Sequence, residues 1–135
     1  MQHIYEWYNH LKISRGLASA NNNEKFIDIL NDFGGRIKNS SKMQHKWRML
    51  SAHDGDMSPL LLRLNISSAR CVEEKYRRGY TDALNCEPST EYVSSLIFEL
   101  HSDEEGRHQV KIRHNGRYVY LCERREVSCP WEEFD

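Results

Sequence analysis

The sequence predicts a mixed α/β fold, and three patterns carry that prediction. Apolar residues between Phe26 and Ile37 recur at helical spacing. An apolar run over residues 47–52 is typical of a buried strand and leads directly into a second helical stretch. Residues 96–121 alternate apolar and polar side chains around an Asn-Gly pair, which favours antiparallel strands joined by a tight turn.

Length and charge restrict the class of protein. The 135 residues leave room for one domain, and a hydrophobic content of 39% predicts a modest core. The formal net charge is -1, whereas a generic nucleic-acid binder would carry a clear basic excess, so we expect no nucleic-acid partner. The longest uncharged apolar run, residues 59–62, is far shorter than the roughly 20 residues that span a bilayer, so no membrane span is expected. We interpret one basic stretch as a solvated face; it comprises Arg36, Lys38, Lys42, Lys46 and Arg48, with Trp47 among them.

Two helices are expected in the first 40 residues. Aromatic residues and histidines favour a short helix over about residues 3–13. The polar residues 21–23 then break the chain and offer N-cap oxygens. An apolar stripe predicts an amphipathic helix that ends at residues 39–41; the stripe comprises Phe26, Ile29, Leu30, Phe33 and Ile37.

A strand followed by a helix is expected next. Residues 47–52 are interpreted as a short buried strand, and residues 57–64 as a helix with Pro59 in its first turn, where a missing N–H costs least. His53 and Asp54 would then lie at the carboxyl end of the strand, just before the helix. In open α/β sheets, ligands bind at that position.

The second half of the chain predicts antiparallel strands. Residues 68–92 are polar, and we interpret them as irregular. Strands are expected over residues 96–100, 110–113 and 118–121, with the hairpin turn at Asn115 and Gly116. A Cys-bracketed loop from residue 122 ends the chain.

The cysteines and two sequons favour an oxidising compartment. None of the four cysteines forms a Cys-x-x-Cys pair, which argues against a zinc ribbon. Of the three possible pairings we favour the local one, and we prefer it to reactive thiols; it joins Cys71 to Cys86 and Cys122 to Cys129. Asn39 and Asn65 each begin an N-glycosylation sequon. The first seven residues nevertheless lack the basic start and apolar stretch of a signal peptide, so either the compartment is wrong or Met1 is not the true start.

His53 and Asp54 are the strongest candidates for functional residues. An imidazole donates hydrogen bonds to an anion, and a neighbouring carboxyl serves as a general acid. The structural alternative is that this pair only caps the following helix. A second alternative is a metal site built from His45, His53, Asp54 and Asp56, but its spacing matches no metal motif, and we expect no metal or cofactor. Arg113 and His114 suggest a phosphate-binding Arg-His-Gly sequence, but we interpret them as part of a hairpin turn.

These residues resemble the histidine acid phosphatases. Residues 49–54, followed by an apolar helix that ends at 64–66, resemble the His-Asp block of that family. The strands, the hairpin and a closing segment from Cys122 to Phe134 follow in the family's order, and the helix around residues 26–37 resembles the one before its catalytic strand. The resemblance covers about residues 24–134.

The resemblance implies a phosphomonoesterase that works at acid pH through a phosphohistidine intermediate. It implies that residues 1–135 are the C-terminal portion of one histidine phosphatase-like domain, in which an incomplete doubly wound sheet ends in an antiparallel hairpin. His53 would contact the phosphate of a phosphate monoester, and Asp54 would protonate the leaving alcohol. The full protein would then be secreted or lysosomal, with its signal peptide in the missing portion.

Two departures from the family's sequence motifs change the activity that we expect of this chain. No Arg-His-Gly-x-Arg-x-Pro motif occurs in the sequence, so the nucleophile is absent and we expect no turnover by this chain alone. The family follows His-Asp with a threonine, whereas Gly55 and Asp56 follow here. Asp56 would repel a phosphate dianion unless it points away or is protonated.

The rival interpretation is a non-catalytic module: a degenerate fragment that binds a partner, or a misassigned gene with no separate function. A lone strand before His53 would also have bare edges. We therefore expect the isolated chain to be poorly stable or to self-associate, and a homodimer is one such assembly.

Overall fold

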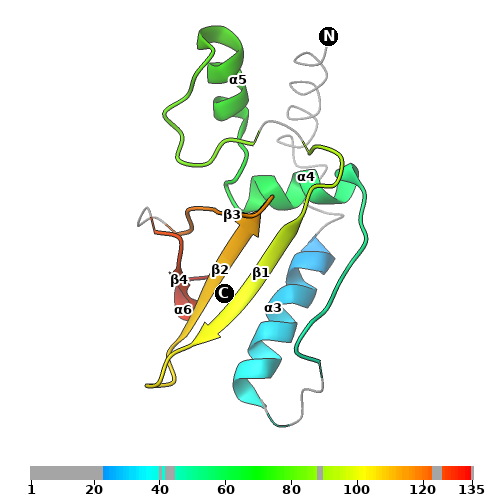
Figure 1. Cartoon of the computed structure of the whole chain (residues 1–135), viewed down its shortest axis with the longest axis vertical. Coiled ribbons are helices and arrows are strands. Elements are labelled where there is room, and N and C mark those ends of the chain that lie inside the picture. Colours follow the sequence, from blue (N-terminus) through cyan, green and yellow to red (C-terminus); the bar gives the residue numbers. More distant parts are fainter. Residues whose placement is uncertain (1–22, 40, 42–44, 88–89, 123–125, 135) are drawn as a thin grey trace.

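The computed structural model describes residues 23–39, 41, 45–87, 90–122 and 126–134. The helix expected over residues 3–13 lies outside these ranges, as does Lys42. Figure 1 shows the arrangement of the described elements, which are helices α3 (Asn23–Lys38), α4 (Asp54–Arg63), α5 (Ala69–Arg78) and α6 (Trp131–Phe134), and strands β1 (Leu96–Ser102), β2 (His108–His114), β3 (Arg117–Tyr118) and β4 (Cys129–Pro130).

The sheet is antiparallel and centred on β2. β1 pairs with one edge of β2 along its whole length, with Phe98 opposite Ile112. β3 and β4 also pair with β2, at residues 113–114 and 109–110. The mixed α/β class is therefore confirmed. Parallel strands, which a doubly wound sheet requires, are not among the described residues, so that finer expectation stays a prediction.

The predicted hairpin is confirmed. Asn115 and Gly116 both have positive φ, at 49° and 80°, as a two-residue turn of this kind requires. The Asn115 side chain accepts a hydrogen bond from the Ser95 N–H at 2.9 Å, which ties the turn to the residue before β1. Arg113 and His114 close β2 rather than forming the turn itself.

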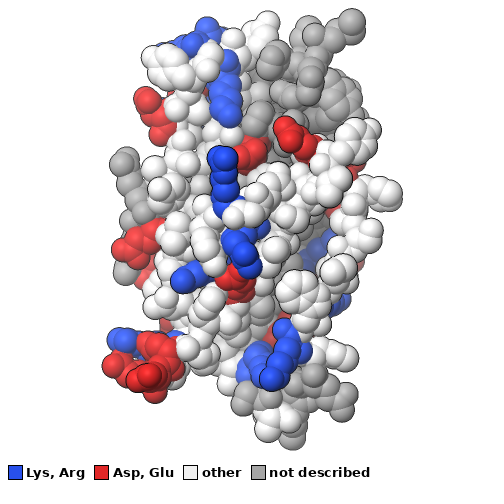
Figure 2. All heavy atoms as spheres, viewed as in Figure 1, with Lys and Arg blue, Asp and Glu red and all other residues white. Residues whose placement is uncertain are grey.

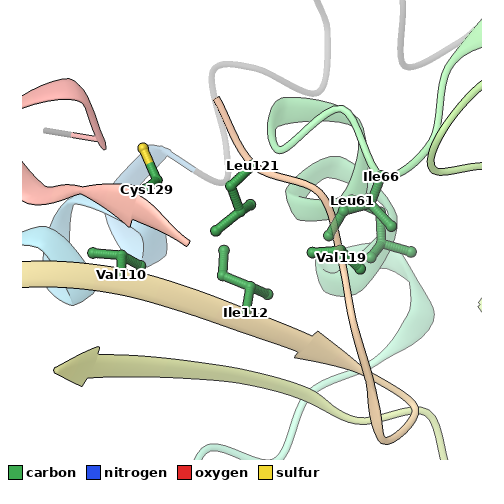
Figure 3. Packing of buried hydrophobic residues seen from close by; sticks show 7 residues of the cluster. All are labelled: Leu61, Ile66, Val110, Ile112, Val119, Leu121 and Cys129. Carbon is green, nitrogen blue, oxygen red and sulfur yellow. The ribbon is translucent and has the colours of Figure 1, made fainter. Parts of the chain in front are cut away.

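The core lies on one face of the sheet, against α3, α4 and α6. Its buried cluster, drawn in Figure 3, consists of Leu61, Ile66, Val110, Ile112, Val119, Leu121 and Cys129. The predicted stripe of α3 reaches this core, since Phe33 packs against it and contacts the Trp131 ring at 6.2 Å between centroids. The Phe26 ring lies 5.9 Å from that of Phe134. α3 thus forms as predicted, because its apolar stripe has a surface to cover.

The prediction that residues 68–92 are irregular was wrong. Helix α5 occupies their first part, and its ends carry recognisable signals. Ser68 is the N-cap, and its hydroxyl accepts the Cys71 N–H at 3.1 Å. Gly79 closes the helix in the left-handed conformation at φ 75°, with its N–H bonded to the Lys75 carbonyl. The two cap residues were visible in the sequence, but six of the ten residues between them are charged, which favours a polar, irregular segment.

Both predicted disulfides are present in the structure. Cys71 joins Cys86 with 5.7 Å between their Cα atoms, and Cys122 joins Cys129 with 5.9 Å. The first bridge fastens α5 to the loop that follows it, and the Lys75 ammonium donates to the Cys86 carbonyl at 3.0 Å. The second bridge fastens the chain after β3 to β4.

The prediction of a buried strand over residues 47–52 was also wrong. This stretch has no regular secondary structure, and its large side chains are exposed: Trp47 by 68%, Met49 by 78% and Leu50 by 55%. A strand needs a neighbour to satisfy its backbone, and no strand among the described residues pairs with this one. Arg48 instead holds the stretch against α3 through Asp32, at 2.7 Å, and Asp28, at 3.6 Å.

The surface charge follows the balanced composition. On the face shown in Figure 2, Lys and Arg side chains lie between Asp and Glu side chains and uncharged areas, and they do not gather into one stripe. No helix among the described residues is long and apolar enough to cross a bilayer.

Candidate functional site

His53 and Asp54 begin helix α4. His53 is the N-cap, with the extended backbone angles φ −95° and ψ 168°, and Asp54 is the first helical residue. The Asp56 carboxylate accepts the His53 N–H at 3.1 Å, which is half of a capping box. The helix therefore starts three residues earlier than predicted, and Pro59 lies in its second turn instead of its first.

The buried side of α4 holds this corner in place. Leu61 is 1% exposed within the core cluster, and Leu60 is also buried. The Ser58 hydroxyl lies 3.2 Å from that of Thr90, so the loop before β1 is fastened to the second turn of α4. The orientation of His53 and Asp54 thus follows from the packing of a helix, not from a free loop.

Both candidate side chains face solvent. His53 and Asp54 are exposed, and the Asp54 carboxylate accepts the Gly55 N–H at 2.7 Å. The structure therefore brings an imidazole, a carboxyl and the first turn of a helix to one accessible corner. The partial positive charge of a helix N-terminus favours an anion there.

Asp56 points away from that corner, toward α3. Its carboxylate lies 2.5 Å from the Lys25 ammonium. The hydrogen bond from Lys25, followed by the one from the His53 N–H, lowers the pKa of Asp56 below its ordinary value. Asp56 is thus ionised, but Lys25 balances its charge, which weakens the repulsion of a phosphate dianion that the sequence suggested. Its role is to cap α4 and connect it to α3.

This pairing predicts a pH-dependent contribution to stability. Because the pKa of Asp56 is lower in the folded chain, its charge stabilises the fold above the ordinary value of 3.8 and that stabilisation is lost as the pH falls below it. Asp56→Asn keeps a cap acceptor but removes the charge, and should lower stability at neutral pH by less than about 1 kcal/mol, since both partners contact water. In thermal melts, the difference in melting temperature between Asp56→Asn and the wild type should shrink as the pH falls from neutral to acid. Glu132→Gln, at an exposed carboxylate, is the control and should show no such gap; a constant gap for Asp56→Asn would contradict the assignment.

The structure does not bring together the four residues of the metal alternative within its described part. His45, His53, Asp54 and Asp56 do not form a group with ligand atoms close enough to share an ion. The one such group in the described ranges is Cys122, Cys129 and Glu133, and its sulfurs are joined in a disulfide, so they offer no thiolate.

A second polar cluster lies on the sheet face opposite the core, and sequence reasoning missed it. The half-buried Glu99 carboxylate pairs with the Arg113 guanidinium and accepts the Tyr118 hydroxyl at 3.1 Å. His101 Nε2 lies 2.9 Å from it. Burial raises the pKa of Glu99, but the hydrogen bonds from His101, Tyr118 and Arg113 outweigh burial and leave it below its ordinary value.

This cluster explains why Arg113 and His114 do not form a phosphate-binding pair. Arg113 is engaged by Glu99, whereas the next residue, His114, points to the opposite face and is only 4% exposed. The two side chains therefore cannot act together on a phosphate. Period-two alternation along residues 108–114 is the sequence signal that could have separated them.

The two sequon asparagines are both exposed. Asn65 follows the C-terminus of α4 with a positive φ of 54°, at the opposite end of the helix from His53. A glycan on Asn65 would therefore leave the His53 corner open.

No family model, curated protein or solved structure matches this chain.

Proposed function

We propose that this chain supplies the proton-donor part of a phosphomonoesterase site of the histidine acid phosphatase type. The observation that carries the proposal is the exposed pair of His53 and Asp54, held at the N-terminus of α4 by the buried side of that helix. In this role His53 contacts the phosphate, and Asp54 protonates the leaving alcohol.

The chemistry needs a protonated Asp54. As the bond from phosphorus to the ester oxygen breaks, the carboxyl proton passes to that oxygen and the alcohol departs. His53 donates a hydrogen bond to a phosphate oxygen, and the N-terminus of α4 favours the same negative charge.

The nucleophile has to come from another polypeptide segment. The sequence contains no Arg-His-Gly-x-Arg-x-Pro motif, and Arg113 already pairs with Glu99. We propose that residues 1–135 are the C-terminal portion of an incomplete doubly wound domain. The two disulfides support a secreted or lysosomal location for the whole protein.

A second candidate is a non-catalytic interaction module. The exposure of Trp47 and Met49 favours it, because large apolar side chains in contact with water are typical of a surface that binds another chain. The two candidates differ in one respect: only the first requires phosphate to bind at His53.

A titration with inorganic phosphate at acid pH, monitored through the amide signals in NMR spectra, tests the proposal. We expect weak binding that shifts the amide signals of residues 53–56, because phosphate bound by His53 would lie beside the first turn of α4. His53→Ala should weaken binding several-fold, whereas His45→Ala, at another exposed histidine, should leave it unchanged. An absence of shifts at residues 53–56 would favour the non-catalytic module.

An assay with a generic aryl phosphate tests the missing nucleophile. The intact chain should show no hydrolysis above buffer at acid pH. Turnover that Asp54→Asn abolishes would show that this chain carries a complete site, and the proposal of a partial one would be wrong.

A further inference from the structure

The N-glycosylation sequon at residues 65–67 is exposed at its first residue and buried at the other two. Asn65 is exposed, whereas Ile66 is 0% exposed and Ser67 is 3% exposed. Ile66 belongs to the core cluster drawn in Figure 3, where it lies beside Leu61 of α4. The second and third residues of the sequon are therefore part of the folded core and not of a surface loop.

Backbone hydrogen bonds hold the same three residues in a turned conformation. Asn65 has a φ of 54°, in the left-handed region. The N–H groups of Ile66 and Ser67 both donate to the Leu61 carbonyl, at 2.8 and 3.0 Å. An enzyme could straighten this segment only after these bonds break.

The Cys71–Cys86 disulfide holds a second segment against the sequon. Glu87 directly follows Cys86, and its N–H donates to the Ile66 carbonyl at 3.0 Å. Cys71 lies in the first turn of α5, which begins just after the sequon. The bridge therefore joins the two chain segments that flank Ile66.

We propose that Asn65 is an N-glycosylation site that only the unfolded chain presents, so its glycan has to be added before the chain folds and the Cys71–Cys86 bridge forms. The sequon is defined by its asparagine together with its serine, so an enzyme that recognises it has to contact both side chains. In the folded chain Asn65 is within reach, but Ser67 is not.

The modification transfers an oligosaccharide from a lipid diphosphate to the Asn65 amide nitrogen. A bond forms between that nitrogen and the first sugar carbon, and the bond from this carbon to the diphosphate oxygen breaks. The lipid diphosphate leaves, and the amide loses one proton. Because the Asn65 side chain is exposed, the chain can fold around the attached glycan.

This inference does not depend on phosphate chemistry at His53. Its use in a cell rests on the secreted or lysosomal location proposed above, because the donor and the enzyme belong to the secretory pathway. The accessibility of the sequon is a property of the fold alone. The inference and the proposed catalytic role can therefore fail separately.

Purified oligosaccharyltransferase, supplied with a lipid diphosphate-linked oligosaccharide, tests the proposal on two forms of the full chain. One form is folded with both disulfides closed, and the other is reduced, alkylated at its four cysteines and unfolded by circular dichroism. Mass spectrometry of the peptide that contains Asn65 should find at least about tenfold less glycan on the folded form, because modification there requires local unfolding. Asn65→Gln should remove this product from both forms.

Asp82→Asn with Leu84→Ser is the matched control, since it creates a sequon at residues 82–84 of the loop after α5. These three positions are exposed and have no regular secondary structure, so this sequon should be modified to a similar extent in both forms. Equal glycan at Asn65 in the two forms, or none in the unfolded form, would overturn the proposal. So would a control sequon that is closed in the folded chain, because burial of Ile66 and Ser67 would then not be the cause.

Discussion

Replacing Ile112 with alanine should lower the free energy of unfolding by about 2–5 kcal/mol, because a buried isoleucine loses both its transfer free energy and its packing contacts. The Ile112 side chain is 0% exposed and lies in the core cluster on the central strand β2, where α4 packs against the sheet. Urea denaturation of the wild-type and variant chains, with both disulfides intact, measures the difference.

Ile97→Ala is the matched control for that substitution. Ile97 is the same residue type on the neighbouring strand β1, but its neighbours Leu96 and Phe98 are the residues that pack on the core. Its side chain therefore lies on the opposite face, and its loss should cost no more than about 1 kcal/mol. Equal losses for the two variants would contradict the assignment of the core to one face of the sheet.

Removing the Cys71–Cys86 disulfide should lower the free energy of unfolding by about 3 kcal/mol, since the bridge closes a loop across a separation of 15 residues. The physical reason is the extra conformational freedom of the unfolded chain once the loop is open. Cys71→Ala with Cys86→Ala tests this, again by urea denaturation.

The second disulfide provides the comparison for the first. Cys122 and Cys129 are separated by 7 residues, so Cys122→Ala with Cys129→Ala should lower the free energy of unfolding by about 2 kcal/mol. Both members of each pair are replaced, which leaves no free thiol to form new bridges. A larger loss for the shorter loop would show that native packing, and not loop closure, dominates these bridges.

Local patterns predicted the elements whose folding is decided locally. The stripe of α3 required only helical spacing, and the Asn115–Gly116 turn required only residues that accept positive φ. The disulfide pairing followed from short loops. Helix α5 shows the limit of this reasoning, because its Ser68 and Gly79 caps were present but enclose a mostly charged segment.

The candidate site was predictable in its residues but not in its surroundings. The sequence placed His53 and Asp54 between a strand and a helix; the helix is present but begins at Asp54, and the strand is absent. It could not show that Lys25, which is far away in the sequence, neutralises Asp56. Nor could it show that Arg113 is engaged by Glu99 across the sheet, because both contacts depend on how separate elements pack.

By itself, the sequence determined the α3 helix, the antiparallel hairpin, the cysteine pairs and the presence of a helix after His53, since each depends on neighbours in the chain. Only the tertiary structure decided that residues 47–52 are exposed and unpaired. An apolar run becomes a buried strand when another strand satisfies its backbone and another surface covers its side chains. Here Arg48 holds the run against α3, while Trp47 and Met49 remain in water.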